Sequence, residues 1–216
     1  MPTSTAISAQ GTLIQIATGT GGAKTISGVA VGNPTILTAT AHGFSNGDLV
    51  AIAALAGADA ALLNGSSFTV TNKTTNTFAV QVDTTGKTIT AGSGTATPTT
   101  YTTVGNCRTF TGLDGSASEL DKTNLQSTAK EIALGLVDFG QFSFECDHDN
   151  GDAGQAALLA AYNAGTSRTM KVVLPAGTTP TASFTAYIKK FALVGGIDAI
   201  ARRNVDARIS GSVTWA

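Results

Sequence analysis

The densest group of polar side chains in the sequence lies between Glu145 and Asp152, where the chain reads Glu-Cys-Asp-His-Asp-Asn-Gly-Asp. Carboxylates and imidazoles ligate divalent cations, so this group is a candidate metal site. The candidate ligands are Glu145, Asp147, His148 and Asp149. The spacing does not fit an EF-hand loop, which needs a glycine at its sixth and a glutamate at its twelfth position. We favour the alternative of a strand that turns into a helix N-terminus, where carboxylates bind free backbone N–H groups.

Cys146 lies two residues before His148, and a thiol beside an imidazole could serve as a nucleophile. However, Cys146 falls in an apolar row with Phe142 and Phe144, and a buried thiol is inert. The other cysteine, Cys107, could form one bridge with it, but two free buried thiols are favoured if the chain folds in a reducing cytosol. We find no catalytic triad, carboxylate pair or metal trio, and therefore predict that the protein is not an enzyme and uses no cofactor.

The amino-acid composition indicates which fold class holds these residues. The chain has 216 residues, 42% of them hydrophobic and only 12% charged, with 25 glycines and a formal net charge of -1. Chains that are poor in charge and rich in threonine and glycine favour β structure. The near-neutral net charge provides no excess of basic side chains for binding the phosphate backbone of nucleic acid. The longest apolar run, Val50–Leu63, is broken by Asp59 and is too short to cross a bilayer, so we expect no membrane association.

Two segments near the C-terminus alternate strictly between apolar and polar residues, as half-buried strands do. One is Gln141–Asp147, and the other is Val205–Trp215. Their polar rows are Gln141, Ser143, Glu145 and Asp147 in the first, and Asp206, Arg208, Ser210, Ser212 and Thr214 in the second. Further strands are expected at Arg168–Leu174 and Ser183–Leu193.

One helix is predicted over Asp152–Asn163. Asp152 and Gln155 fit a capping box, and Gly165 is a stop signal. Its apolar anchors would be Leu158, Leu159 and Tyr162. The expected fold is mainly β: an antiparallel β-sandwich or barrel with one flanking α-helix, plus an inserted small β-barrel domain.

The insertion follows from the uneven charge distribution, because residues 1–23 carry no charged side chain and residues 24–100 carry few. Gly19–Gly22 and Thr97–Tyr101 are interpreted as linkers. The main domain would comprise residues 1–23 and 99–216, and the inserted domain residues 24–98. Strand-like runs in the insertion are Thr35–Thr40, Asp48–Leu55, Ser67–Val70, Asn76–Val82 and, more weakly, Thr88–Ala91. A lone strand at Gly11–Ala17 needs a partner, and Thr100–Phe110 is the first candidate.

A long segment, Leu113–Leu136, is expected to be an irregular loop between two strands. Loops of this length inside a compact domain are usually functional or bound to a partner. We interpret the segment as a contact with a neighbouring subunit, through Leu120, Leu125, Lys130, Glu131 and Ile132. The alternative is a flap folded onto its own domain.

Three motifs occur in an order that resembles the tail tube proteins of phages with long, non-contractile tails. They are the run from Asp121 to Glu145, the run Asp152–Ala161, and the terminal strand with its Ile-Ser-Gly-Ser core. The resemblance implies a virion protein, assembled in the host cytoplasm, that polymerises into stacked hexameric rings. Such a tube surrounds a tape-measure protein, meets tail-tip and terminator proteins, and conducts DNA without binding it. The row Gln141, Ser143, Glu145 and Asp147 is one candidate for its lumen face, and the row of Asp206 is another.

The middle of the chain resembles a different group of proteins. Thr40–Val50, Leu63–Asn72 and Asn76–Val80 look like small β-barrel repeats of phage virion proteins, which are similar to the first-catalytic-cysteine half-domain of ubiquitin-activating enzymes. Residues 24–100 contain no cysteine, so no thiol chemistry is implied. The main alternative function is a monomeric surface- or glycan-binding β module of a virion or cell surface.

Overall fold

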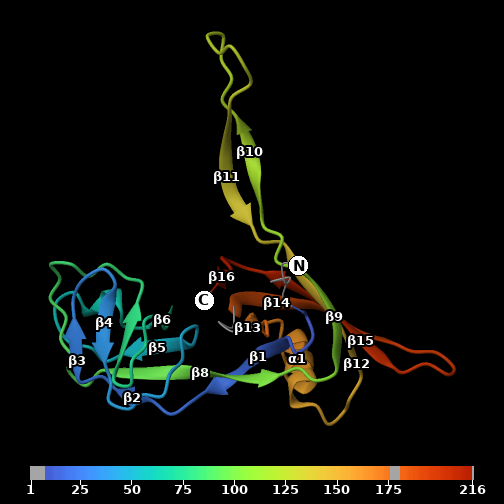
Figure 1. The fold of residues 1–216 in the computed structure, drawn as a ribbon, viewed down its shortest axis with the longest axis horizontal. Helices are drawn as coiled ribbons and strands as arrows, with labels where there is room; N and C mark the ends of the chain where they lie inside the picture. Colours follow the sequence, from blue (N-terminus) through green and yellow to red (C-terminus); the bar gives the residue numbers. More distant parts are fainter. Residues whose placement is uncertain (1–7, 176–180, 216) are drawn as a thin grey trace, which may run out of the picture. The chain divides into compact units, whose positions relative to one another are not determined.

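The computed structural model describes residues 8–175 and 181–215, and their fold is mainly antiparallel β with one α-helix (Figure 1). The expected fold class is therefore confirmed. The chain divides into two compact units, the first comprising residues 1–16 and 102–214 and the second residues 17–101 and 215–216. It leaves the first unit within β1 (Leu13–Thr20) and returns within β8 (Thr95–Thr103). The interpretation of Thr97–Tyr101 as a linker is wrong, because its residues lie inside β8.

In the first unit, β1 begins a sheet of antiparallel strands in the order β1-β13-β14-β15-β12-β9. The other strands of this sheet are β13 (Arg168–Val173), β14 (Thr181–Val194), β15 (Arg202–Ile209), β12 (Gln141–Asp147) and β9 (Cys107–Gly112). The short β16 (Thr214–Trp215) ends the described chain. Ile14 accepts a backbone hydrogen bond from Val104, which lies in the segment predicted to pair with the first strand.

The core of this unit lies on the apolar face that the alternation predicts. Phe142, Phe144 and Cys146 of β12 are buried, together with aliphatic residues of the neighbouring strands. The Phe142 ring packs against Phe144 and Phe184, with ring centroids 5.6 and 5.4 Å away. Because side chains alternate along a strand, the polar residues of β12 point to the opposite face of the sheet.

The helix α1 (Ala153–Ala164) closes one side of this core. Its buried residues are Gly154, Gln155, Leu158 and Ala161. Leu158 is confirmed as an anchor, but Leu159 and Tyr162 are 40% and 44% exposed, so those two assignments are wrong. Gln155, Leu158 and Ala161 recur at every third position, and this stripe leaves Leu159 and Tyr162 on its outer flank.

The segment expected to be an irregular loop forms a β-hairpin instead. Its strands are β10 (Ser116–Asp121) and β11 (Ile132–Asp138), coloured yellow-green in Figure 1. Within the described part of the chain these two strands pair only with each other. Local pairing gives the backbone of this segment the hydrogen bonds that no other strand supplies. Alternation of Ile132, Leu134 and Leu136 with smaller residues fits a strand, and the loop interpretation overlooked it.

The second unit has a core of its own, enclosed by two small antiparallel sheets. One sheet contains β6, β5 and β8 with β2 beside β8, and the other contains β3, β4 and β7. Their bounds are β2 (Lys24–Thr25), β3 (Gly28–Ala30), β4 (Thr35–Thr38), β5 (Leu49–Ala53), β6 (Ser66–Thr69) and β7 (Thr77–Val80), with a short 3-10 helix at Ala60–Leu62. The weak run Thr88–Ala91 is not a strand and forms a single bridge from Thr90 to Ala56.

Candidate assembly surfaces

The polar face of the first unit's sheet brings the two predicted polar rows together. In the register of β12 and β15, Gln141 lies opposite Arg208 and Ser143 opposite Asp206. Both strands turn their apolar rows toward the core, which also contains Leu158 of the helix. The two rows are therefore neighbours on one face, directed away from the helix. Ser210 and Ser212 lie beyond the end of β15, and Thr214 belongs to β16.

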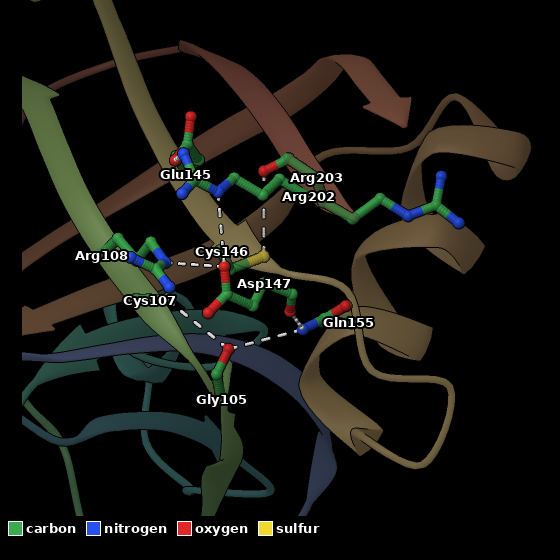
Figure 2. A network of polar contacts seen from close by, with 9 residues as sticks. All are labelled: Gly105, Cys107, Arg108, Glu145, Cys146, Asp147, Gln155, Arg202 and Arg203. Atoms are coloured by element: carbon green, nitrogen blue, oxygen red, sulfur yellow. Dashed lines mark hydrogen bonds and ion pairs between the residues drawn. The ribbon is translucent and has the colours of Figure 1, made fainter. Parts of the chain in front are cut away.

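Ion pairs cross this face from strand to strand (Figure 2). Asp147 is their centre: Arg108 of β9 donates from Nε to its Oδ1 at 2.6 Å, and Arg202 Nε of β15 lies 3.6 Å from the same oxygen. Arg202 also donates to Glu145 Oε1 at 2.9 Å. The chain thus arranges two carboxylates and two guanidinium groups as an alternating cluster on three adjacent strands.

Two further ion pairs lie on this face. Lys190 Nζ lies 3.8 Å from Asp206, and Arg208 pairs with Asp138 at the base of the β10–β11 hairpin. Each of these carboxylates has a basic partner, so this part of the polar face carries paired charges. The hydrogen bond from Arg108 lowers the pKa of Asp147 below its ordinary value of 3.8. The pKa of Asp138 is lowered first by the backbone N–H of Gly140 and then by Arg208.

A β-bulge places Arg108 on the polar face. The β9–β12 register passes from Glu145 opposite Thr109 to Cys146 opposite Cys107, so Arg108 is the extra residue. Bulges redirect side chains in this manner. Sequence reasoning missed Arg108, because one extra residue within β9 leaves no signal in the sequence of either strand.

The cluster Glu145–Asp152 has the predicted form of a strand, a turn and a helix N-terminus. Asp152 is the N-cap and accepts the Gln155 N–H at 2.7 Å. The Gln155 side chain does not complete a capping box: it donates to the carbonyl of Asp147 at 2.8 Å and accepts from Asp149 N–H at 3.2 Å. Among residues 8–175 and 181–215, no group of three or more His, Cys, Asp or Glu side chains could hold a metal ion.

The β10–β11 hairpin displays the predicted contact residues to solvent. Leu125 is 102% exposed, and Leu120, Lys130, Glu131 and Ile132 are exposed as well. Two further leucines of the same apolar segment are exposed with them, Leu134 at 70% and Leu136 at 92%. A hairpin with so many exposed aliphatic side chains is unusual for a surface that faces only water. Exposure on this scale argues against a flap that covers its own unit.

A second exposed apolar group lies where β14 turns into β15. β13 accompanies β14 only as far as the pair Arg168 and Ala186, and beyond it β14 continues as the partner of β15 as far as Val194. At the end of this extension the exposed side chains are Leu193, Val194, Ile197 and Ile200. Sequence reasoning missed this tip. The available signal was a group of aliphatic residues around Gly195–Gly196, where a polar turn is the norm.

The comparison with protein families decides what kind of molecule carries these surfaces. Residues 68–216 match the family model described as phage tail tube, TTP, lambda-like. The match covers more than half of the chain, including the polar sheet face, the β10–β11 hairpin and the apolar tip between β14 and β15.

The chain belongs to the lambda-like phage tail tube family.

As a member of that family, this tail tube protein is a structural component of the phage tail and acts in a tail of many subunits. The family is structural and not enzymatic, in line with the sequence prediction. A chain of the anti-feeding prophage (AFP) baseplate, solved by cryo-EM with 6-fold symmetrisation, is similar with a TM-score of 0.41 and 8% identity over 80% of this chain and 94% of that one. No curated protein matches the sequence. Within the described residues of the tail tube protein, helices long and apolar enough to cross a membrane are absent.

Proposed function

We propose that the protein polymerises into stacked rings, six subunits to a ring, that form the tail tube around a tape-measure protein and conduct DNA during ejection. In this proposal tail-tip and terminator proteins meet the two ends of the tube, and assembly takes place in the host cytoplasm. The observation that carries it is the family match, joined to exposed apolar hairpins that need partners.

The lumen face is proposed to be the polar face of β12 and β15, with Gln141, Ser143, Glu145 and Asp147 at its centre. A passage for DNA must not hold the phosphate backbone by charge, because each phosphate contact adds affinity. Arg108 and Arg202 are engaged by Asp147 and Glu145 and so are not free to bind phosphates. A lumen face on which the charges are paired is consistent with DNA that passes through the tube without being bound.

The contacts between copies are proposed to be the β10–β11 hairpin and the apolar tip between β14 and β15. In the hairpin the contact residues are Leu120, Leu125, Lys130, Glu131 and Ile132, together with the exposed Leu134 and Leu136 of β11. A tube of identical subunits needs contacts around each ring and contacts between rings, both of them head-to-tail. Two separate apolar surfaces on one chain can meet these two requirements. Residues 24–98 are proposed to be an inserted β-barrel module outside the tube-forming contacts.

The test compares the wild-type chain with a Leu134→Ser/Leu136→Ser variant. Burying a leucine contributes about 1.5–3 kcal/mol, and about 1.4 kcal/mol is tenfold in an equilibrium constant. We expect the pair of substitutions to raise the critical concentration for polymerisation at least about a hundredfold. Sedimentation across a concentration series gives the critical concentration, and negative-stain electron microscopy shows whether the pellet contains tubes.

The matched control is Val31→Ser/Leu62→Ser, which removes two exposed aliphatic side chains of the second unit, 42% and 44% exposed. This control should polymerise at the wild-type concentration. Equal critical concentrations for all three chains would refute the hairpin contact. Single wild-type particles at every concentration would count against the tube and favour a monomeric surface- or glycan-binding module.

A further inference from the structure

The two cysteines of the chain lie opposite each other on adjacent strands. Cys107 begins β9, Cys146 is near the end of β12, and the antiparallel register pairs them directly. Both are free thiols in the structure, and Figure 2 shows them beside the ion-pair cluster. Cys146 is fully buried and Cys107 packs against the same core, so the two thiols lie on one face of the sheet.

The local hydrogen bonding makes this a close pair. Asp147 donates its backbone N–H to Asn106 at 3.0 Å, so the bond joins the residues flanking the cysteines and not the cysteines themselves. Opposite residues of such a non-hydrogen-bonded pair have Cα atoms about 4.5 Å apart and side chains closer than elsewhere in the ladder. Disulfides require a Cα separation of about 4.4–6.8 Å. The backbone is therefore placed for a cross-strand disulfide without a shift of either strand.

Cys107 is also within reach of solutes. A cavity of 530 Å³ lies between the N-terminal segment and β9, lined by Ala9–Thr12, Ile14 and Cys107–Phe110. Cys146 does not line this cavity, so a solute would meet Cys107 first.

We propose that Cys107 and Cys146 are a disulfide-forming pair that joins β9 to β12 when the folded protein meets a small oxidising disulfide such as glutathione disulfide. The Cys107 thiol loses its proton and attacks one sulfur of glutathione disulfide, forming a mixed disulfide and releasing one glutathione. Cys146 then loses its proton and attacks Cys107 Sγ, releasing the second glutathione. Two thiols are oxidised and one disulfide is reduced, so the electrons balance.

The reaction replaces three weak contacts. Cys107 Sγ lies 3.3 Å from the Val104 carbonyl oxygen and 4.0 Å from that of Gly105, and Cys146 Sγ donates to the Arg203 carbonyl at 3.9 Å. These contacts end when the thiol protons are lost and the sulfurs join. The bond closes a loop that contains the whole β10–β11 hairpin, because β9 precedes the hairpin and β12 follows it. It also fastens β9, which is at the edge of the first unit's sheet.

Burial slows the proposed reaction and gives it a pH signature. Burial raises the pKa of Cys107 to about 12, with Cys146 and Asp152 adding to the shift. Burial is also the main cause that raises the pKa of Cys146 to about 11. The attacking species is the thiolate. Far below these pKa values its fraction grows tenfold per pH unit, so oxidation should accelerate by about that factor for each unit between about pH 7 and 9.

The experiment incubates the native full-length chain with glutathione disulfide and follows it by intact mass and peptide mapping, with circular dichroism to confirm that the fold persists. The wild type should lose two hydrogen atoms, retain no glutathione, remain monomeric on a non-reducing gel and yield a Cys107–Cys146 peptide. Its melting temperature should rise by about 5–10 °C, because the closed loop restricts the unfolded chain.

Two variants test the assigned order of attack. Cys146→Ser should keep one glutathione on Cys107, whereas Cys107→Ser should stay unmodified while folded. A wild-type chain that keeps a glutathione adduct, keeps both thiols free, or links to a second copy would overturn the proposal. The mapping of the wild type does not depend on either variant, nor on whether the protein forms tubes.

Discussion

Replacing Gly154 by alanine is expected to destabilise the first unit, although alanine is the better helix former. Gly154 is the second residue of α1 and is buried against the chain that leads into β9. A Cβ atom built there would lie 2.6 Å from Val104 Cα and 2.8 Å from Thr103 C, and closer still to the Thr103 carbonyl oxygen. All three atoms belong to the backbone, so no side chain can rotate away.

The two opposing effects can be weighed. Alanine in place of glycine within a helix gains at most about 1 kcal/mol. Overpacking a well-filled site costs typically about 1–3 kcal/mol, and occasionally more. Here the helix start cannot shift freely, because Asp152 accepts from Gly105 N–H at 3.1 Å and Gln155 donates to the Asp147 carbonyl at 2.8 Å. Together the two effects give a net loss of about 0–3 kcal/mol in the free energy of unfolding. We expect about 2 kcal/mol, because the helix start is held in place.

The measurement is the free energy of unfolding from urea denaturation, followed by far-ultraviolet circular dichroism. The matched control is Gly165→Ala at the other end of α1, where a Cβ atom meets nothing within 4 Å but φ is +60°. It should lose only the cost of a left-handed alanine, about 1 kcal/mol. If Gly154→Ala equals or exceeds the wild type in stability, the close packing of α1 on residues 103–104 is refuted.

Two further predictions concern charges and the second unit. Asp138 and Asp147 have lowered pKa values in the folded state, so their stabilisation is complete above the unfolded pKa near 3.8 and is lost as pH falls through the lower folded values. Asp138→Asn/Asp147→Asn should therefore flatten the dependence of melting temperature on pH below about pH 4, and an unchanged slope would contradict the assignment. In the second unit Asn64 accepts from Leu55 N–H and donates to the Leu55 carbonyl, each at 2.9 Å. Asn64→Ala should lower the free energy of unfolding by about 1–3 kcal/mol, and Asn64→Asp, which keeps only the acceptor, should also destabilise; a neutral Asn64→Ala would show that the pair contributes nothing.

Much of the strand pattern could be predicted from the sequence because it depends on local alternation. The apolar row of Phe142, Phe144 and Cys146 and the N-cap at Asp152 are properties of a few consecutive residues. A half-buried strand and a capped helix each require particular residue types at fixed short spacings. The mainly β fold and the polar rows could be predicted on that basis.

The β10–β11 hairpin shows where this reasoning was incomplete. The sequence indicated that Leu120, Leu125 and Ile132 belong to an unusual segment, but not that the segment pairs with itself. Leu134 lies opposite Glu119 of β10, yet Leu134 and Leu136 are exposed because, among the described residues, the hairpin pairs with no further strand. The pattern of one segment does not record whether a larger sheet will join it. The exposed tip between β14 and β15 was missed as well. Its exposure follows from the fact that β13 ends before the tip, and the sequence of β14 and β15 does not show where β13 ends.

By itself the sequence determined which side chains share a strand face, where the helix starts, and that the chain is nearly neutral. Only the tertiary structure decided which strands are neighbours, and with them the pairing of Arg108 and Arg202 with Asp147 and of Cys107 with Cys146. These partners lie far apart along the chain. Strand order and a single bulge bring them together, and both are set by packing across the whole sheet, which no local pattern records.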